Sequence, residues 1–261
     1  MNRLILLVSL VVILALGGTA CVKTNTSSVA PPEIPRSAPN PALAAHPSLA
    51  HIRAVMADPA KPHFTIVALG DSNTELNWTS RGHLNWVGLL SAGLFESGYP
   101  GRYTVINSGF SGDSATKALD RLDRDVLAYN PDLVIITFGG NDERLNTAEQ
   151  TEVSMRELIR RVRAAGQSSI LVRTPVPFFD DKGGFEEHAN LALHVDAIRR
   201  AARAEDVALL DVYALWTAPD QPLPPSTYRY DRLHPNEYGH RRMYGEIAPL
   251  LGLHETLRWE K

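Results

Sequence analysis

Five short apolar runs, rich in β-branched residues, divide the chain from residue 64 onward. Each run is apolar throughout and does not alternate with polar residues, which is typical of a strand covered on both faces of a sheet. Polar segments with helical periodicity separate the runs. The predicted strands cover residues 64–69, 103–107, 133–138, 169–173 and 207–212.

The clearest helical pattern begins at Thr147, where Gln150 three residues later completes the sequence of a capping box. Apolar residues then recur at the spacing of one helix face until Gly166, a residue type that is common just after a helix. Further helices are predicted at residues 84–96, 114–128, 186–204 and 236–251, with a shorter one at 49–56.

This alternation of strands and helices predicts right-handed crossovers and a parallel sheet. We therefore expect a three-layer α/β/α sandwich around a five-stranded parallel sheet. Ligands of such sheets bind beyond the carboxyl ends of the strands. Ser72 follows the first predicted strand and Asn141 follows the third, so we expect these two residues to meet in space.

Composition and charge narrow the class of protein. The chain has 261 residues, of which 44% are hydrophobic, and this suffices for one domain with a full core. The formal net charge is -3, and the sequence has no basic stripe of the kind that neutralises phosphates. Nucleic-acid binding is therefore not expected.

Residues 1–20 have the pattern of an export signal. Asn2 and Arg3 precede an apolar stretch at residues 4–16, and small residues occupy positions 17–20. The apolar stretch is short for a membrane span, and a buried N-terminal helix of the fold is the alternative.

Cys21 is the only cysteine, so the chain has no intramolecular disulfide. Its position directly after Thr19 and Ala20 resembles the lipobox of bacterial lipoproteins, although Gly18 stands where that pattern prefers leucine. The resemblance implies lipid attachment at Cys21 and a protein of the cell envelope that is anchored to a membrane. An ordinary secretory signal cut after Ala20, with a secreted or periplasmic product, is the alternative.

The segment at residues 21–45 contains five prolines and almost no large apolar residue. Such a composition cannot bury enough surface to order itself, so we expect a flexible tether. The globular domain is predicted to cover residues 46–261.

Three separated clusters supply the parts of a serine esterase. Ser72 lies in Gly70-Asp71-Ser72-Asn73 and needs a base to become a nucleophile. His234 is the best candidate, because Asp231 lies three residues earlier and a tight turn places carboxylate and imidazole on one side. Pro235 is expected to mark the start of the last helix. The Asp-His pair by itself is also consistent with a turn and its capping aspartate.

Candidate donors for an oxyanion follow the first three predicted strands. The Asn141 side chain offers an amide, Gly112 offers a backbone N–H with no side chain in the way, and the backbone N–H of Ser72 is a third donor. As isolated motifs, Gly-Gly-Asn-Asp is an ordinary turn sequence, and Gly109 and Gly112 are ordinary loop glycines.

Taken together, residues 64–251 resemble the SGNH, or GDSL, hydrolase family. The resemblance implies a flavodoxin-like sheet, an acyl-enzyme route and no cofactor. The serine, glycine, asparagine and histidine that name the family, and the aspartate of its triad, match Ser72, Gly112, Asn141, His234 and Asp231.

Two positions qualify this resemblance. Asn73 stands where the older family name implies leucine, at a position without a role in proton transfer. Gly112 is preferred over Gly109 because it matches the Ser-Gly-Asp form of the glycine block.

Other titratable residues compete for a functional role. His83 is nearer to Ser72 in sequence but has no carboxylate beside it. The acidic segment that contains Asp180, Asp181, Glu186, Glu187 and His188 has residue types that bind metals, but an exposed acidic loop is the favoured interpretation, so no metal is expected.

The substrate is predicted only as a class. Aromatic residues in loops after the strands offer stacking surfaces for a sugar or a wall for an acyl chain: Trp78, Phe178, Phe179, Tyr228 and Tyr230. The favoured function is hydrolysis of short acyl esters, with acetyl groups on carbohydrate as one candidate. An acyltransferase with the same acyl-enzyme, or a non-catalytic envelope binding protein, are the alternatives.

Overall fold

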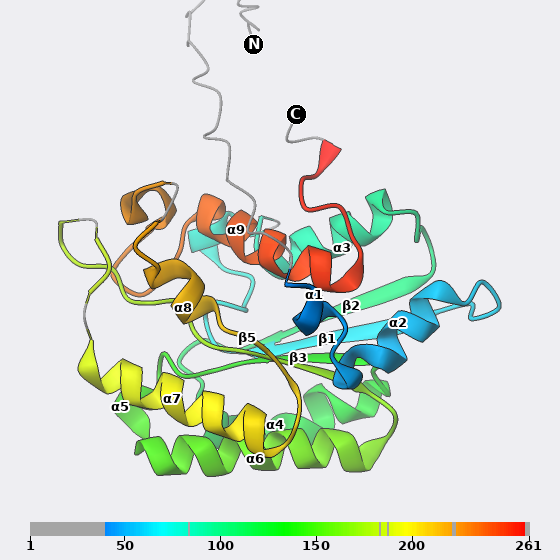
Figure 1. The fold of residues 1–261 in the computed structure, drawn as a ribbon, viewed down its shortest axis with the longest axis horizontal. Helices are drawn as coiled ribbons and strands as arrows, with labels where there is room; N and C mark the ends of the chain where they lie inside the picture. Colours follow the sequence, from blue (N-terminus) through cyan, green and yellow to red (C-terminus); the bar gives the residue numbers. More distant parts are fainter. Residues whose placement is uncertain (1–39, 83, 183, 187, 221–222, 259–261) are drawn as a thin grey trace, which may run out of the picture. The chain divides into compact units, whose positions relative to one another are not determined.

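A computed structural model describes residues 40–82, 84–182, 184–186, 188–220 and 223–258, all within one compact unit (Figure 1). Its centre is a five-stranded parallel sheet in the order β2-β1-β3-β4-β5, as in flavodoxin-like folds. The strands are β1 (Phe64–Gly70), β2 (Tyr103–Gly109), β3 (Leu133–Thr137), β4 (Ser169–Arg173) and β5 (Ala208–Leu210).

Helices cover both faces of the sheet, which gives the predicted three-layer sandwich (Figure 1). One face carries α1 (Pro41–Ala44), α2 (Ala50–Ala57), α3 (Trp86–Glu96), α8 (Val212–Thr217) and α9 (Glu237–Ile247). The other face carries α4 (Ala115–Asp125), α5 (Asp142–Leu145), α6 (Ala148–Ala165) and α7 (Ala189–Ala204). Short 3₁₀ helices are η1 (Pro47–Leu49), η2 (Trp78–Ser80), η3 (Leu127–Tyr129), η4 (Pro225–Tyr228) and η5 (Ala248–Leu251).

The strands contribute to two separate cores because successive side chains point to opposite faces of a sheet. In β1, Ile66 and Ala68 pack into the core under α3 and α9, whereas Val67 and Leu69 pack into the core under α4 and α6. This double burial explains why the strands are apolar throughout.

The carboxyl ends of the strands are aligned at one edge of the sheet. Gly70 pairs with Gly109 on one side and Thr137 on the other, and Thr137 in turn pairs with Arg173. Loops that leave this edge therefore begin close together.

Helix boundaries differ modestly from the prediction. The capping box at Thr147 is present, and the predicted helix at 236–251 is α9 followed by η5. The predicted fifth strand ends at Leu210, because the Asp211 side chain accepts a hydrogen bond from the N–H of Ala214 and caps α8.

The N-terminal predictions lie outside the described residues: the export signal at 1–20, the lipidation site Cys21, and the tether as far as residue 39. The described chain begins at Asn40, which caps α1. Leu43 and Ala44 pack against the core, so this end of the predicted tether belongs to the domain. Within the described ranges, none of the helices combines the length and apolarity needed to cross a membrane.

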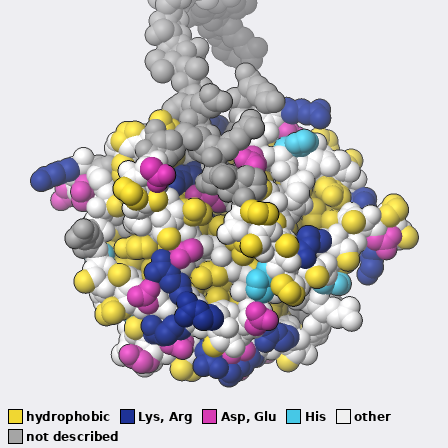
Figure 2. All heavy atoms as spheres, viewed as in Figure 1, with side chains coloured by type: hydrophobic (Ala, Val, Ile, Leu, Met, Phe, Trp, Pro, Cys, Tyr) yellow, Lys and Arg dark blue, Asp and Glu magenta, His cyan; other side chains and the backbone are white. Residues whose placement is uncertain are grey.

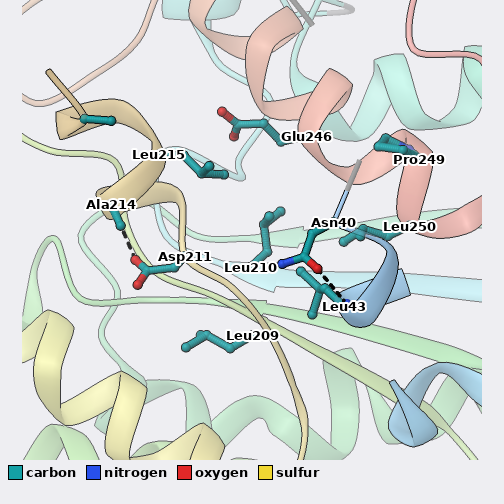
Figure 3. A pocket seen from close by; sticks show the side chains of 11 residues that line it. Asn40, Leu43, Leu209, Leu210, Asp211, Ala214, Leu215, Glu246, Pro249 and Leu250 are labelled. Atoms are coloured by element: carbon teal, nitrogen blue, oxygen red, sulfur yellow. Dashed lines mark hydrogen bonds between the residues drawn. The ribbon is translucent and has the colours of Figure 1, made fainter. Parts of the chain in front are cut away.

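A largely apolar cavity of about 290 Å³ lies between α1, β5, α8 and η5 (Figure 3). Leu43, Leu210, Leu215 and Leu250 contribute to its wall. On the face shown in Figure 2, basic and acidic side chains are interspersed. Ion pairs of the described residues include those of Glu205 with Arg156, Arg160 and Arg163.

Candidate active site

Ser72, His234 and Asp231 form a continuous chain of hydrogen-bonding groups. The Ser72 Oγ atom lies 3.0 Å from His234 Nε2, and His234 Nδ1 lies 2.9 Å from both carboxylate oxygens of Asp231. With its Nδ1–H donated to Asp231, the imidazole leaves Nε2 free to accept the serine proton. This is the arrangement of a nucleophile, a base and an orienting carboxylate.

Backbone hydrogen bonds build the turn that carries Asp231 and His234. Asp231 Oδ1 accepts from the N–H groups of Leu233 and His234, each at 2.8 Å. The Tyr230 N–H donates to the His234 carbonyl at 2.9 Å. Burial raises the pKa of the Asp231 carboxyl, but the hydrogen bonds from His234 and from the two backbone N–H groups outweigh burial and hold it below its usual value. The carboxylate is therefore ionised when it orients the imidazole.

The start of α9 differs from the prediction. Asn236, and not Pro235, caps the helix, and its Oδ1 accepts from the N–H groups of Tyr238 and Gly239. Pro235 instead lies in the turn and forms an antiparallel bridge with Arg229.

The turn that holds Ser72 is fixed on several sides. The Asp71 carbonyl accepts from the N–H groups of Thr74 and Glu75, each at 3.0 Å, and the Asn77 side chain donates to the Ser72 carbonyl at 2.8 Å. A Cβ atom at Gly70 would lie 2.2 Å from Thr74 Oγ1, so only glycine fits before this turn. Ser72 is largely buried, with 8% of the residue exposed, in a turn held by these hydrogen bonds.

Asp71 is a buried carboxyl directly before the serine. Burial raises its pKa from 3.8 to about 6, and the charges of Asp142 and Asp113 act in the same direction, while the Asn73 N–H and His234 oppose the shift. Sequence analysis did not single out this residue, although its place between a strand and the serine was a usable signal.

The predicted oxyanion donors lie in the loops after β2 and β3. Asn141 occupies the N-cap position of α5 without a side-chain capping bond, and its side-chain N–H donates to the Asp113 carbonyl at 2.9 Å. The same amide has a second hydrogen to donate. Gly112 has a φ of +75°, and a Cβ added there would meet nothing within 4 Å. Gly109 has a different role, because its Cβ would lie 2.2 Å from the Glu75 nitrogen. Glycine is thus favoured at Gly109 by a close contact and at Gly112 by its backbone conformation, and Gly112 as the oxyanion donor stays a prediction.

Two supporting residues were missed by sequence analysis. Asp142 is buried and accepts hydrogen bonds from the N–H groups of Gly139 and Ala115, both at 3.0 Å, which ties the Asn141 loop to the start of α4. Arg121 contacts Asp113 at 2.8 Å and donates to the Gly70 carbonyl at 3.1 Å. Asp142 is the last residue of the Gly-Gly-Asn-Asp motif, which was a usable signal, whereas the contacts of Arg121 with Asp113 and Gly70 join distant segments and leave no local motif in the sequence.

The five predicted aromatic residues divide into two groups. Phe178, Phe179 and Tyr228 are buried and serve packing. Trp78 is 75% exposed and follows Ser72 by six residues, and Tyr230 is 51% exposed and directly precedes Asp231. Further exposed apolar residues, which the prediction missed, follow the first three strands in sequence: Leu76, Phe110 and Leu145.

Other titratable residues of the described domain have partners of their own. His194 is buried and shares a hydrogen bond of 2.8 Å with Thr151 Oγ1. Asp180 accepts from the N–H groups of Lys182 and Gly184 and closes its own loop. Within the described part of the chain, no group of three or more His, Cys, Asp or Glu residues has the arrangement of a metal site. His83 and Glu187 lie outside the described residues.

Comparisons with known proteins give the same family as the resemblance. The GDSL-like Lipase/Acylhydrolase family matches residues 68–242, a range that contains all five predicted site residues of the domain. Esterase TesA of Pseudomonas aeruginosa is 34% identical over 116 residues, which are 43% of this chain and 55% of that protein, so the match spans about half of TesA. The thioesterase 1/protease 1/lysophospholipase L1 of Escherichia coli is 27% identical over 173 residues, which are 66% of this chain and 76% of that enzyme.

Solved structures share the fold. An acetylxylan esterase from Geobacillus stearothermophilus superposes with a TM-score of 0.63 and 21% identity, over 75% of this chain and 98% of that one. LAE5, an alpha/beta hydrolase enzyme from the metagenome of Lake Arreo, gives a TM-score of 0.61 and 26% identity, over 72% of this chain and 95% of that one. Because the family match covers more than half of the chain and the sheet order agrees with it, the chain belongs to the GDSL-like lipase/acylhydrolase family and is an ester hydrolase of that family.

Proposed function

We propose that this protein cleaves carboxylic esters through an acyl-enzyme formed on Ser72. The observation that carries the proposal is the unbroken chain from Asp231 through His234 to the Ser72 hydroxyl. His234 Nε2 takes the serine proton as Oγ attacks the ester carbonyl, and then gives this proton to the departing alcohol. Water, deprotonated by the same imidazole, attacks the acyl-enzyme and releases the acid together with the free serine.

The proposed oxyanion donors are the backbone N–H groups of Ser72 and Gly112 and the side-chain amide of Asn141. Three observations support this set: the ordered turn at Ser72, the open left-handed backbone at Gly112, and the hydrogen bond that orients the Asn141 amide. Asp142 holds the Asn141 loop in place.

The proposed substrates are short acyl esters, and among them acetyl groups on carbohydrate. Exposed aromatic side chains at Trp78, Phe110 and Tyr230 stand in the segments that carry the site, and flat aromatic surfaces of this kind stack on sugar rings. A relative named acetylxylan esterase, from Geobacillus stearothermophilus, is 26% identical over 168 residues and so adds support.

We favour hydrolysis over acyl transfer because the base and the carboxylate of the triad are partly open to solvent. The Asp231 side chain is 47% exposed and His234 is 22% exposed, whereas a transferase must keep water from its acyl-enzyme. A sugar acceptor added to the assay separates the two: a transferase yields acylated sugar, and a hydrolase yields free acid.

The experiment that tests the function is a hydrolysis screen. The protein is assayed with p-nitrophenyl esters of increasing chain length and with acetylated xylo-oligosaccharides, and a serine-reactive phosphonate is used to label Ser72. Hydrolysis that declines with chain length, together with labelling of wild type but not of Ser72→Ala, is expected. Absence of both hydrolysis and labelling would support the non-catalytic binding protein instead.

The proposed location is the cell envelope, with lipid attachment at Cys21 as the membrane anchor. A single cysteine after small residues, followed by a proline-rich segment, supports it. A Bacillus subtilis protein named uncharacterized lipoprotein YqeF is 30% identical over 129 residues, which are 45% of this chain and 51% of that protein.

A further inference from the structure

Arg173, the last residue of β4, is a fully buried cation behind the active site. Its exposed fraction is 0%, and none of its three side-chain nitrogens has a hydrogen-bond partner among the described residues. Burial lowers its pKa to about 10, while the negative charges of Glu246 and Asp71 oppose the shift. A buried guanidinium without hydrogen bonds is costly, so its position calls for a function.

The indole of Trp86 connects Arg173 to the nucleophile turn. The guanidinium carbon lies 4.9 Å from the centre of the Trp86 ring, within the range of a cation–π interaction. The Trp86 Nε1–H donates to the carbonyl of Asn73 at 3.1 Å, and Asn73 directly follows Ser72. One buried side chain thus touches both the cation and the turn that carries the serine.

His240 on α9 holds the other end of Trp86. Its Nδ1 accepts from the Trp86 backbone N–H at 3.4 Å, so Nε2 carries the proton of the neutral ring. Burial lowers the pKa of His240 to about 3, and the charges of Arg173 and His234 act in the same direction, so the ring stays neutral. The titratable groups that act on Arg173 are thus Asp71, Glu246 and a neutral His240.

Buried polar atoms without partners occur in the segments next to Arg173 and Trp86. The Nε2–H of His240 and the side-chain oxygens of Asn73, Thr74 and Thr137 are buried and unpaired within the described part of the chain. Thr137 is the register partner of Arg173 on β3, and Asn73 and Thr74 belong to the turn after β1. Buried donors and acceptors in such numbers are commonly satisfied by ordered water molecules.

We propose that Arg173 is a positioning residue of the esterase site, which fixes the turn that carries Ser72 through Trp86 and through internal water bound to its guanidinium. The inference rests on the proposed function. Its consequence is kinetic: without Arg173, Trp86 loses its cation partner, the Asn73 carbonyl shifts, and Ser72 Oγ leaves its position 3.0 Å from His234. A misplacement of about 1 Å costs as much as about 10²-fold in rate.

The test compares Arg173→Met with the conservative Arg173→Lys, using hydrolysis of p-nitrophenyl acetate over a range of pH. Arg173→Met is expected to lower kcat by about 10- to 100-fold with KM changed less than about twofold. The acid limb of its pH–rate profile is expected to move to higher pH, because the loss of the Arg173 charge raises the pKa of the nearby Asp71 carboxyl. Arg173→Lys keeps the charge over the indole and is expected to recover most of kcat.

Arg242→Met is the matched control. Arg242 is also a buried arginine stacked on aromatic rings, 4.6 Å from the Trp216 ring centre, and it pairs with Glu246 at 3.1 Å, but no contact joins it to Ser72 in the described structure. It is expected to lower the melting temperature while kcat stays within about twofold of wild type; kcat alone is compared, because Arg242 shares Glu246 with Arg173.

Trp86→Phe tests the same connection if Arg173→Met fails to fold. It keeps an aromatic ring for Arg173 but removes the donor to Asn73, so about a tenfold loss in kcat is expected in a folded protein. The inference is overturned if Arg173→Met keeps the kcat and pH profile of wild type, or if Arg242→Met loses activity equally. An inactive wild type would refute the proposed function and this inference with it, whereas an active wild type with an equally active Arg173→Met would refute this inference alone.

Discussion

At the residue scale, the activity depends on one proton that moves between two side chains. Ser72 Oγ and His234 Nε2 are 3.0 Å apart, so replacement of either group removes the step that creates the nucleophile. We expect Ser72→Ala and His234→Ala each to lower kcat/KM for p-nitrophenyl acetate by about 10⁴-fold or more, with an unchanged melting temperature. Residual activity within tenfold of wild type would contradict the assignment.

Loss of the Asn141 side chain is expected to affect stabilisation of the transition state and not proton transfer. Its amide is expected to stabilise charge that exists only in the transition state, so Asn141→Ala is expected to lower kcat by about 10²- to 10³-fold with little change in KM. Steady-state kinetics with p-nitrophenyl acetate measure both constants. A change confined to KM would make Asn141 a substrate-binding residue instead.

Asp71 links the site to the pH dependence of stability. Its pKa of about 6 in the fold exceeds the ordinary 3.8, so the folded state binds more protons between these values and the free energy of unfolding falls as pH rises through that window. Above pH 6 the penalty is fully present, about 3 kcal/mol. Asp71→Asn is therefore expected to gain stability over wild type at pH 8 but not at pH 4, as measured by urea unfolding. An equal gain at both pH values would show that the carboxyl titrates normally.

Residues with a local motif were predictable, and residues that act through distant contacts were not. Ser72 and His234 each lie in a short sequence motif, and the residue types of these motifs indicate a nucleophile and a base. Arg173 ends an apolar strand, and its role depends on Trp86, a residue brought to it only by the packing of α3 on the sheet. The exposed fraction of the loop aromatics was equally undetermined, because burial depends on which loops pack together.

At the scale of elements, the capping box of α6 shows how local sequence determines a boundary. Thr147 Oγ1 accepts from the Gln150 N–H, and Gln150 Oε1 accepts from the Thr147 N–H at 2.8 Å. Thr147→Ala is expected to lower the free energy of unfolding by about 1 kcal/mol, without an effect on kcat. Thr147→Ser, which keeps the hydroxyl, is the control; if it lost as much stability as Thr147→Ala, the hydroxyl would not be the cause.

Element length decides which helices the sequence predicts. The 18 residues of α6 repeat their apolar face often enough to be recognised, and the five strands are distinct because both faces are buried. The 4-residue α5 and the 6-residue α8 are too short to establish a period. The Asp211 side chain caps α8 by accepting from the Ala214 N–H, which it can do only once β5 is in place, whereas the Asn141 side chain makes no capping bond to α5.

At the scale of the whole molecule, the order of the strands assembles the site. The chain moves from β1 outward to β2 and then returns to β3 on the other side of β1, so the loops after these three strands diverge at a topological switch point. Ser72, Gly112 and Asn141 lie in those three loops. The turn before α9 then brings His234 over the same edge, which explains how residues so distant in sequence meet.

At the same scale, we propose that a lipid on Cys21, a residue outside the described part of the chain, would fix the protein to a membrane. Two or more acyl chains bind a bilayer far more firmly than one, so lipidated wild type is expected in the membrane fraction. Cys21→Ser is expected in the soluble fraction or unprocessed, with wild-type kcat, because the described domain contains every proposed catalytic group. Fractionation and mass spectrometry of the mature N-terminus measure this. Soluble wild type that begins with an unmodified Cys21 would instead establish simple secretion.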